Sequence, residues 1–189
     1  MQYVKKTCQI EESIKKSKFI GMIAPTLAET EALQFIQSLH KAHPNASHVV
    51  FAYRILTPDG MICRFNDAGE PSGTAGKPIF HHLEGKNIIN TTVAVIRYFG
   101  GVKLGAGGLT RAYGNCAGNV IDNAEFSNYV ILKRLRLILD YHQLQELEYF
   151  LKHHDGHIVQ QDFKEQIRLT VELPEVQADG LINRFNSQI

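Results

Sequence analysis

The stretch "TTVAVIRYFGGVKLGAGGLTRAYGNCAGN", residues 91–119, decides the fold of the first part of the chain. Residues 91–99 are apolar on both faces, which predicts a central strand covered on both sides. After the glycines, apolar residues recur at helical spacing and predict a helix over about 108–123. This apolar stripe consists of Leu109, Ala112, Tyr113, Cys116, Val120 and Ile121.

The glycine-rich segment between this strand and this helix has the character of an anion site. A helix N-terminus presents unpaired N–H groups and a partial positive charge, and glycine lets a ligand approach the backbone. Lys103 and Arg111 add positive charge, and Arg97, the one charged residue of the strand, points to the same end. The pattern predicts a cradle for a phosphate or a carboxylate.

A purely structural interpretation of these glycines stays open. The segment has neither the GxxxxGK[ST] nor the GxGxxG spacing of the standard nucleotide loops. The glycines of the loop can serve a tight turn alone; they are Gly100, Gly101, Gly105, Gly107 and Gly108. Gly114 and Gly118 are expected to let the helix pack closely on the sheet.

A second glycine-rich loop, "NDAGEPSGTAGKP", covers residues 66–78. It leads from a strand to a helix start, because Pro78 is tolerated only in a first helical turn. It carries the carboxylates Asp67 and Glu70 and the hydroxyls Ser72 and Thr74. The alternative is a polar surface turn in which Ser72 or Thr74 caps the helix.

The other residues before position 126 predict two β-hairpins and a helix between them. Alternating residues from 3 to 24 predict a β-hairpin. Thr26 and Glu29 have the spacing of a capping box, which predicts a helix that ends at Pro44-Asn45. Residues 48–56 and 61–65 predict two strands joined by the turn "PDG".

The segment "NAEFSNY", residues 123–129, is the predicted domain boundary. The sequence beyond it predicts a strand, a helix that ends at Gly156, a hairpin and a final helix near Pro174. This order is most of a ferredoxin-like split βαβ unit. The predicted domains are therefore residues 1–126 and 127–189.

The charge balance gives no general attraction to nucleic acid or to an anionic membrane, because 20 Lys and Arg face 19 Asp and Glu. Residues 1–126 carry 13 basic and 10 acidic residues, a net charge of +3; the remainder carries 7 and 9, a net charge of −2. Three scattered cysteines, the lack of a signal-peptide pattern and the lack of a long apolar run predict a cytoplasmic protein without a membrane segment. No metal is expected, since the histidines lack zinc-site spacing. His48, at the start of the predicted strand 48–56 and before the loop at residues 66–78, is the histidine to test.

The motif "GEPSGTAGKP" followed by "VIRYFGGVKLGAGGLTRAY" resembles the YigZ/IMPACT family. "ASHVVFAYRI" and the order of elements after residue 126 also fit. The resemblance implies an α+β protein: an N-terminal ribosomal-protein-S-five-domain-two-like fold with a left-handed βαβ crossover, and a C-terminal ferredoxin-like domain. It also implies similarity to domains of elongation factor G and, for the first domain, to GHMP kinases. The family's second domain has a last edge strand, relative to which this chain ends early, after "INRFNSQI".

The resemblance further implies a role in translation. Its eukaryotic members act in translational control by competing for a kinase activator, its bacterial members have been proposed to bind nucleic acid, and none has a settled enzymatic activity. The positions that fall on the family's motif are Asp67, Glu70, Pro71, Ser72, Gly73, Thr74, Gly76, Arg97, Gly100, Gly101, Leu104, Gly105, Gly107, Gly108 and Arg111. None of them is implied to be catalytic, and no cofactor is expected.

These observations lead to one main functional hypothesis. The two loops form one anion-recognition corner that binds RNA or a ribosome-associated partner in translation or stress control. Arg97, Lys103 and Arg111 contact phosphates. Glu70 either orients Arg111 through an ion pair or excludes wrong ligands. The alternative is a GHMP-kinase-like phosphotransferase or hydrolase in which Asp67 or Glu70 activates a hydroxyl of the same loop. A protein-interaction module is the third possibility.

Overall fold

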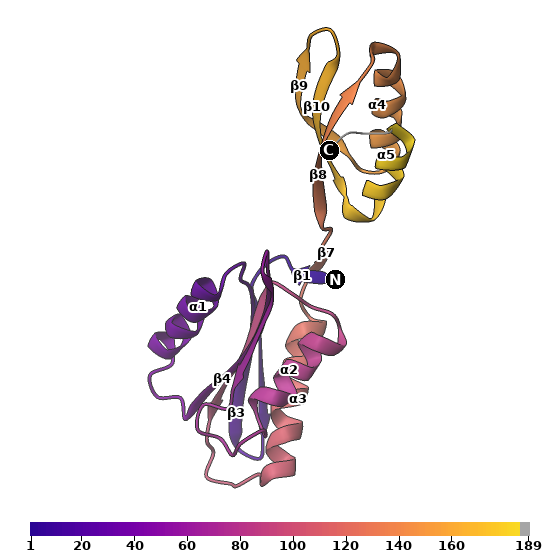
Figure 1. The fold of residues 1–189 in the computed structure, drawn as a ribbon. Coiled ribbons are helices and arrows are strands. Elements are labelled where there is room, and N and C mark those ends of the chain that lie inside the picture. The colour runs from indigo at the N-terminus through magenta and orange to yellow at the C-terminus, as the bar shows by residue number, and fades with distance from the viewer. Residues whose placement is uncertain (186–189) are drawn as a thin grey trace. The chain divides into compact units, whose positions relative to one another are not determined.

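A computed structural model describes residues 1–185 of the chain, which divides into two compact units, Met1–Tyr129 and Val130–Ile189 (Figure 1). Residues 126–128 form a strand that pairs with residues 2–4. Residues 127–129 therefore lie with the first unit, whereas the sequence assigned them to the second domain. Each unit has its own hydrophobic core.

The first unit is built on a five-stranded antiparallel sheet in the order β2-β3-β6-β4-β5. Its strands are β2 (Cys8–Ile14), β3 (Ser17–Pro25), β4 (His48–Thr57), β5 (Gly60–Asn66) and β6 (Thr91–Tyr98). Two short strands, β1 (Gln2–Val4) and β7 (Phe126–Asn128), form a separate pair. The predicted hairpins and the predicted central strand are confirmed, because β6 lies in the middle of the sheet and is buried from Thr91 to Arg97.

Two helical connections of this sheet each cross over one intervening strand. β3 and β4 both run antiparallel to β6, so they are parallel to each other, and the helix α1 (Glu29–Ala42) joins them. In the same way α2 (Gly76–Gly85) joins β5 to β6 across β4. These split βαβ arrangements confirm the α+β class that the sequence predicted.

Helices cover both faces of the sheet, as Figure 1 shows. α1 covers one face, where Ile36 and Leu39 are buried. α2 and α3 (Ala106–Asp122) cover the other face, and the six residues of the predicted stripe on α3 are all buried. Among the buried residues of the part of the chain that the structure describes, Arg97 is the only charged one.

The predicted capping box at the start of α1 is wrong. Ala28 is the N-cap residue and provides no side-chain cap, while Thr26 is buried and shares a 2.8 Å hydrogen bond between hydroxyls with Thr92 on β6. The backbone N–H of Leu27 donates instead to the carboxylate of Glu31 over 2.7 Å. The threonine is thus used to fasten the strand end to the sheet.

The second unit has the strand and helix order that the sequence predicted. β8 (Leu132–Leu139), α4 (Leu144–His153), β9 (His157–Phe163), β10 (Ile167–Pro174) and α5 (Ala178–Phe185) follow one another, with single 3-10 turns before each helix. The sheet order is β8-β10-β9, with β10 antiparallel to both neighbours. This is a ferredoxin-like split βαβ arrangement; the family's last edge strand falls on sequence outside the described residues.

Candidate functional site

The two glycine-rich loops line one hollow of about 330 Å³ in the first unit. Glu70 and Pro71 come from the loop before α2, and Phe99, Lys103 and Gly105 come from the loop between β6 and α3. β4 contributes His48 to the same hollow. β5 and β6 both run antiparallel to β4, so the loops that follow them both emerge near the start of β4.

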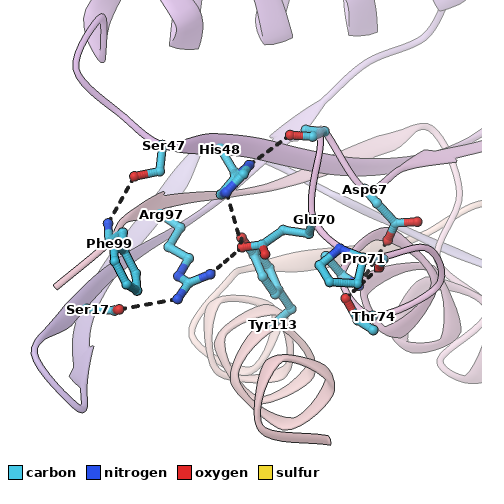
Figure 2. Close-up of polar contacts among 12 residues, drawn as sticks. Ser17, Ser47, His48, Asp67, Glu70, Pro71, Thr74, Arg97, Phe99 and Tyr113 are labelled. Carbon is cyan, nitrogen blue, oxygen red and sulfur yellow. Dashed lines mark hydrogen bonds and ion pairs between the residues drawn. The ribbon is translucent and has the colours of Figure 1, made fainter. Parts of the chain in front are cut away.

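A buried ion pair lies at the floor of this hollow (Figure 2). Arg97 Nη1 donates to Glu70 Oε1 over 2.6 Å, and both side chains are about 5% exposed. The Tyr113 hydroxyl from α3 donates to the same carboxylate oxygen over 2.7 Å. Burial, followed by this hydrogen bond, raises the pKa of Tyr113 far above its ordinary value, so that its hydroxyl keeps its proton.

The guanidinium of Arg97 is further enclosed by two aromatic rings and a hydroxyl. Its central carbon lies 5.6 Å from the ring centroid of Phe19 and 5.4 Å from that of Phe99. Arg97 Nη2 donates to Ser17 Oγ over 3.5 Å, whereas the buried Nε has no partner among the described residues.

Two predicted roles are therefore corrected. Arg97 is not an exposed phosphate contact, because its charge is balanced by Glu70 inside the unit. Glu70 does not orient Arg111, since its partner is Arg97. The pair instead fastens the loop before α2 to the central strand, which fixes one wall of the hollow.

His48 completes this cluster from the start of β4. Its Nδ1 donates to the carbonyl oxygen of Ala68 over 2.9 Å, which leaves Nε2 on the side of Glu70, 3.8 Å from Oε1. The side chain is 25% exposed, so His48 reaches both the buried pair and the hollow. The sequence had marked His48 for testing without placing it in the site.

Asp67 closes the start of α2 rather than facing a ligand. Its carboxylate accepts backbone N–H groups from Gly73 over 2.8 Å, Ala75 over 2.9 Å and Gly76 over 2.8 Å. Burial acts to raise its pKa, but these three hydrogen bonds outweigh burial and lower the pKa below its ordinary value. The predicted anion-binding role of Asp67 and of the Gly73 backbone is thus replaced by helix capping.

Thr74 is also used within its own loop. Its hydroxyl donates to the carbonyl oxygen of Pro71 over 2.6 Å, and the side chain is buried. Neither Thr74 nor Ser72 caps α2, because Asp67 does so. The base and hydroxyl pair that an enzymatic mechanism would need is not formed by Asp67 and Thr74.

Gly100 has a packing role that only glycine can fill. A Cβ atom at this position would lie 1.9 Å from the carbonyl oxygen of Lys16 in the turn between β2 and β3. The N–H of Gly100 donates to Ser17 Oγ over 3.2 Å. The two turn residues Lys15 and Lys16 have positive φ values of 46° and 68°, an unfavourable conformation for lysine, and Lys15 lines a hollow beside α3.

The N-terminus of α3 differs from that of α2, because no side chain caps it. Its N-cap residue is Gly105, with φ at 70°, and no acidic residue occupies its first turn. The N–H groups of Ala106, Gly107 and Gly108 have no acceptor among the described residues, since Leu109 is the first to donate, to Gly105. Gly105 and Ala106 line the hollow, so these donors lie beside it.

Arg111 lies in a neighbouring hollow of about 240 Å³. Lys15 and Gly108 line this second hollow as well, and Leu104 lines both. Lys103 and Arg111 are thus placed in adjacent hollows around the first turn of α3 rather than in one site. Of the remaining predicted residues, Ser72 and Gly101 line neither hollow in the described part of the chain.

The sequence missed the contributions of Tyr113, Ser17 and Phe19. Tyr113 belonged to the predicted apolar stripe of α3, and its hydroxyl was the one polar atom in that stripe capable of a strong hydrogen bond. The packing of Ser17 and Phe19 around Arg97 depends on the pairing of β3 with β6, in which Phe19 lies opposite Arg97.

Residues 1–185 hold no group of three metal-ligating side chains, and their three cysteines are unpaired. None of the helices in this part of the chain is long and apolar enough to cross a membrane.

Comparison with known proteins identifies the family of the chain. The Impact N-terminal domain family matches residues 15–121, and a domain of unknown function, DUF1949, matches residues 137–188. The IMPACT family member YigZ of Escherichia coli is 38% identical over 166 residues, which cover 87% of this chain and 81% of that protein. Protein IMPACT of Rattus norvegicus is 28% identical over 116 residues, covering 60% of this chain and 36% of that protein. A solved structure of a hypothetical protein, 34% identical, superposes with a TM-score of 0.68 over 97% of this chain and 89% of that one. The chain belongs to the IMPACT family.

Proposed function

We propose that this chain is a non-enzymatic, RNA-binding regulatory protein of translation, and that the first turn of α3 receives a phosphate group. The family's role in translational control supports the biological context. The first turn of α3 supports the chemistry, because free backbone N–H groups, a helix dipole and nearby basic side chains together favour an anion.

The contrast between α2 and α3 carries this proposal. Both helices begin in a glycine-rich loop at the same corner of the unit, but Asp67 accepts the N–H groups of Ala75, the N-cap residue of α2, and of Gly76, its first residue. The N–H groups of α3 have no such carboxylate, and Gly105 leaves the backbone open to the hollow. A ligand anion would do for α3 what Asp67 does for α2.

The hollow itself presents little net charge of its own. Arg97 lines it, but its charge is balanced by Glu70, so the attraction for an anion comes from the N–H groups of α3 and from the more exposed basic side chains. Glu70, the carboxylate that also lines this hollow, is already engaged by Arg97 and Tyr113. The carboxylate therefore presents little repulsion to an incoming phosphate.

The arrangement of the basic side chains favours a polyanion over a single small ligand. Lys103 lies on one side of Leu104, while Lys15 and Arg111 lie on the other. Successive phosphates of one strand would meet these separate positions. Phosphate contacts of this kind position a nucleic acid without reading its sequence.

Fluorescence anisotropy with a labelled single-stranded RNA of twelve nucleotides tests this function. We expect Lys103→Ala/Arg111→Ala to weaken binding about tenfold or more. The slope of the logarithm of the binding constant against the logarithm of the salt concentration should become shallower by about 1.4, or about 0.7 for each lost phosphate contact. Lys5→Ala/Lys41→Ala removes the same charge outside both hollows and should bind within about twofold of the unaltered protein. Equal binding by the two double variants would contradict the proposed site.

A thermal-shift measurement separates this function from the enzymatic alternative. ATP or GTP at millimolar concentration would raise the melting temperature of a small-molecule phosphotransferase by mass action. We expect any shift to be small and to be lost in Lys103→Ala/Arg111→Ala, because the loop before α2 uses Asp67 and Thr74 for its own hydrogen bonds. A shift that persists in this double variant would favour the enzyme instead, because the nucleotide would then bind outside the proposed α3 site.

A further inference from the structure

The second unit has one sheet face that no helix covers in the described residues. From Leu135 onward in β8, and along β10, the residues that face α4 and α5 are buried, and the alternate residues are exposed or half-buried. The uncovered face, here called the open face, consists of Arg134, Arg136, Ile138, Arg168, Thr170, Glu172, Gln160 and Asp162.

Charge is segregated on this unit. Residues 130–189 contain 7 basic and 9 acidic residues, so the unit is net negative. The open face nevertheless carries three arginines against two carboxylates. Both carboxylates already have partners, since Glu172 pairs with Arg134 at 2.6 Å and Asp162 pairs with Lys164 at 3.1 Å.

Arg136 and Arg168 are the two arginines of the open face that have no carboxylate partner within residues 1–185. Arg136 lies opposite Thr170 in the register of β8 and β10, and Arg168 precedes Thr170 by two residues. The two arginines are therefore diagonal neighbours, about 7–8 Å apart at the backbone. Two unpaired positive charges at this distance repel each other unless an anion lies between them.

A shallow hollow of about 590 Å³ lies between these two arginines. Thr170 and Gln160 line it with a hydroxyl and an amide, which add hydrogen-bond donors for an oxygen-rich ligand. Asp162, which lies opposite Arg168, also lines the hollow, and its carboxylate is paired with Lys164. Guanidinium groups bind phosphate through paired hydrogen bonds, so the donors match a phosphodiester group. No aromatic ring is among the described residues that line the hollow, so it offers no aromatic platform for stacked bases.

We infer that the open face is a second RNA-binding surface, on which Arg136 and Arg168 hold the phosphate backbone of a single strand without reading its bases. The inference takes RNA as its ligand from the proposed function, but it uses side chains of the other unit. The net charges, +3 for residues 1–126 and −2 for the remainder, give no indication of this surface.

The experiment measures the binding of a labelled oligouridylate of 20 nucleotides to the full chain by anisotropy over a range of salt concentrations. We expect Arg136→Gln/Arg168→Gln to weaken binding about tenfold and to make the salt slope shallower by about 1.4. The matched control, Lys133→Gln/Lys152→Gln, removes the same charge; Lys133 alternates onto the helix side of β8, and Lys152 lies on α4. It should bind within about twofold of the unaltered chain.

The outcomes separate this inference from the proposed function. Unchanged binding by Arg136→Gln/Arg168→Gln, together with weak binding by Lys103→Ala/Arg111→Ala, overturns the open face and leaves the α3 site. The reverse result overturns the α3 site and supports the open face. If polyglutamate of equal charge displaces the RNA from the chain as well as unlabelled oligouridylate does, the assignment to RNA is overturned. All four exchanged side chains are exposed, and circular dichroism melts confirm that the variants fold.

Discussion

Arg97 on the central strand and Glu70 in the loop before α2 form a buried ion pair, with Nη1 2.6 Å from Oε1. This contact joins the loop before α2 to the strand that leads into the other glycine-rich loop, between residues 27 positions apart in the sequence. It also removes the charge of Arg97 from the surface, so that anion binding at this corner depends on the backbone of α3 and on more exposed side chains.

The ion pair has a measurable effect on stability. We expect Arg97→Met to lower the free energy of unfolding by about 3–5 kcal/mol in urea denaturation, because Glu70 would remain buried without its partner. Arg97→Met/Glu70→Gln should be more stable than the single variant, since the unpaired charge is then removed and the amide oxygen still accepts from Tyr113. A double variant less stable than Arg97→Met would show that the buried carboxylate does not cause the loss.

The cap of α2 predicts a dependence on pH. Asp67→Asn should lower the free energy of unfolding by about 2 kcal/mol at pH 7, because three N–H groups lose a charged acceptor. The pKa of Asp67 is lowered in the folded protein, so its contribution is complete above about pH 3.9, the ordinary value, and is lost as the pH falls through the folded value. Urea titrations of both proteins should therefore converge in acid. Asp59→Asn, at an exposed turn, is the control, and a difference that does not shrink as the solution is acidified argues against this cap.

His82 predicts a second pH effect, at the contact between α2 and α3. Its ring lies against Gly118, where an added Cβ would be 3.1 Å away, and burial followed by the nearby Lys86 lowers the pKa of His82. Protonation is therefore less favourable in the folded protein, and stability should fall as the pH drops below about 6.5. Melting curves at pH 7.5 and 5.5 should show a smaller loss for His82→Gln than for the unaltered chain, whereas His40→Gln should behave like the unaltered chain. An equal loss in all three would remove His82 from the explanation.

Gly100 and Gly85 provide a matched pair of substitutions. Gly100→Ala should destabilise the first unit by about 1–3 kcal/mol, because the new Cβ forces the turn at Lys16 to move. Gly85→Ala meets no atom within 4 Å and has no positive φ, so it should be neutral or slightly stabilising. Chemical denaturation of both variants measures the difference, and equal stability would refute the close backbone contact.

Much of the fold follows from local sequence patterns. The alternation of residues 91–99 and the stripe from Leu109 to Ile121 predicted β6 and α3, because burial on both faces and helical periodicity leave strong signals. The capping box at Thr26 failed because a tertiary contact overrode it: Thr92 on the neighbouring strand β6 offered the hydroxyl a better partner. Gly114 and Gly118 were expected to let α3 pack closely on the sheet, but they face α2, where the ring of His82 packs against them.

The chemistry of the site was less predictable than the fold. Which arginine pairs with Glu70 depends on the order of strands, which residue spacing does not specify. Asp67 resembled a surface carboxylate in sequence, and only the folded loop brings it to three backbone donors. The net charge of the second unit does not reveal its open face, because the arginines of that face alternate with core leucines and are outnumbered by acidic residues elsewhere in the unit.

The central claim is that the first turn of α3 is the anion site, and amide chemical shifts of the ¹⁵N-labelled protein test it most directly. Titration with single-stranded RNA should shift the amide signals of Gly107 and Gly108 most strongly in the first unit, while those of Ala75 and Gly76, already bonded to Asp67, stay in place. Shifts confined to the start of α2, or found everywhere except at Gly107 and Gly108, would contradict the claim.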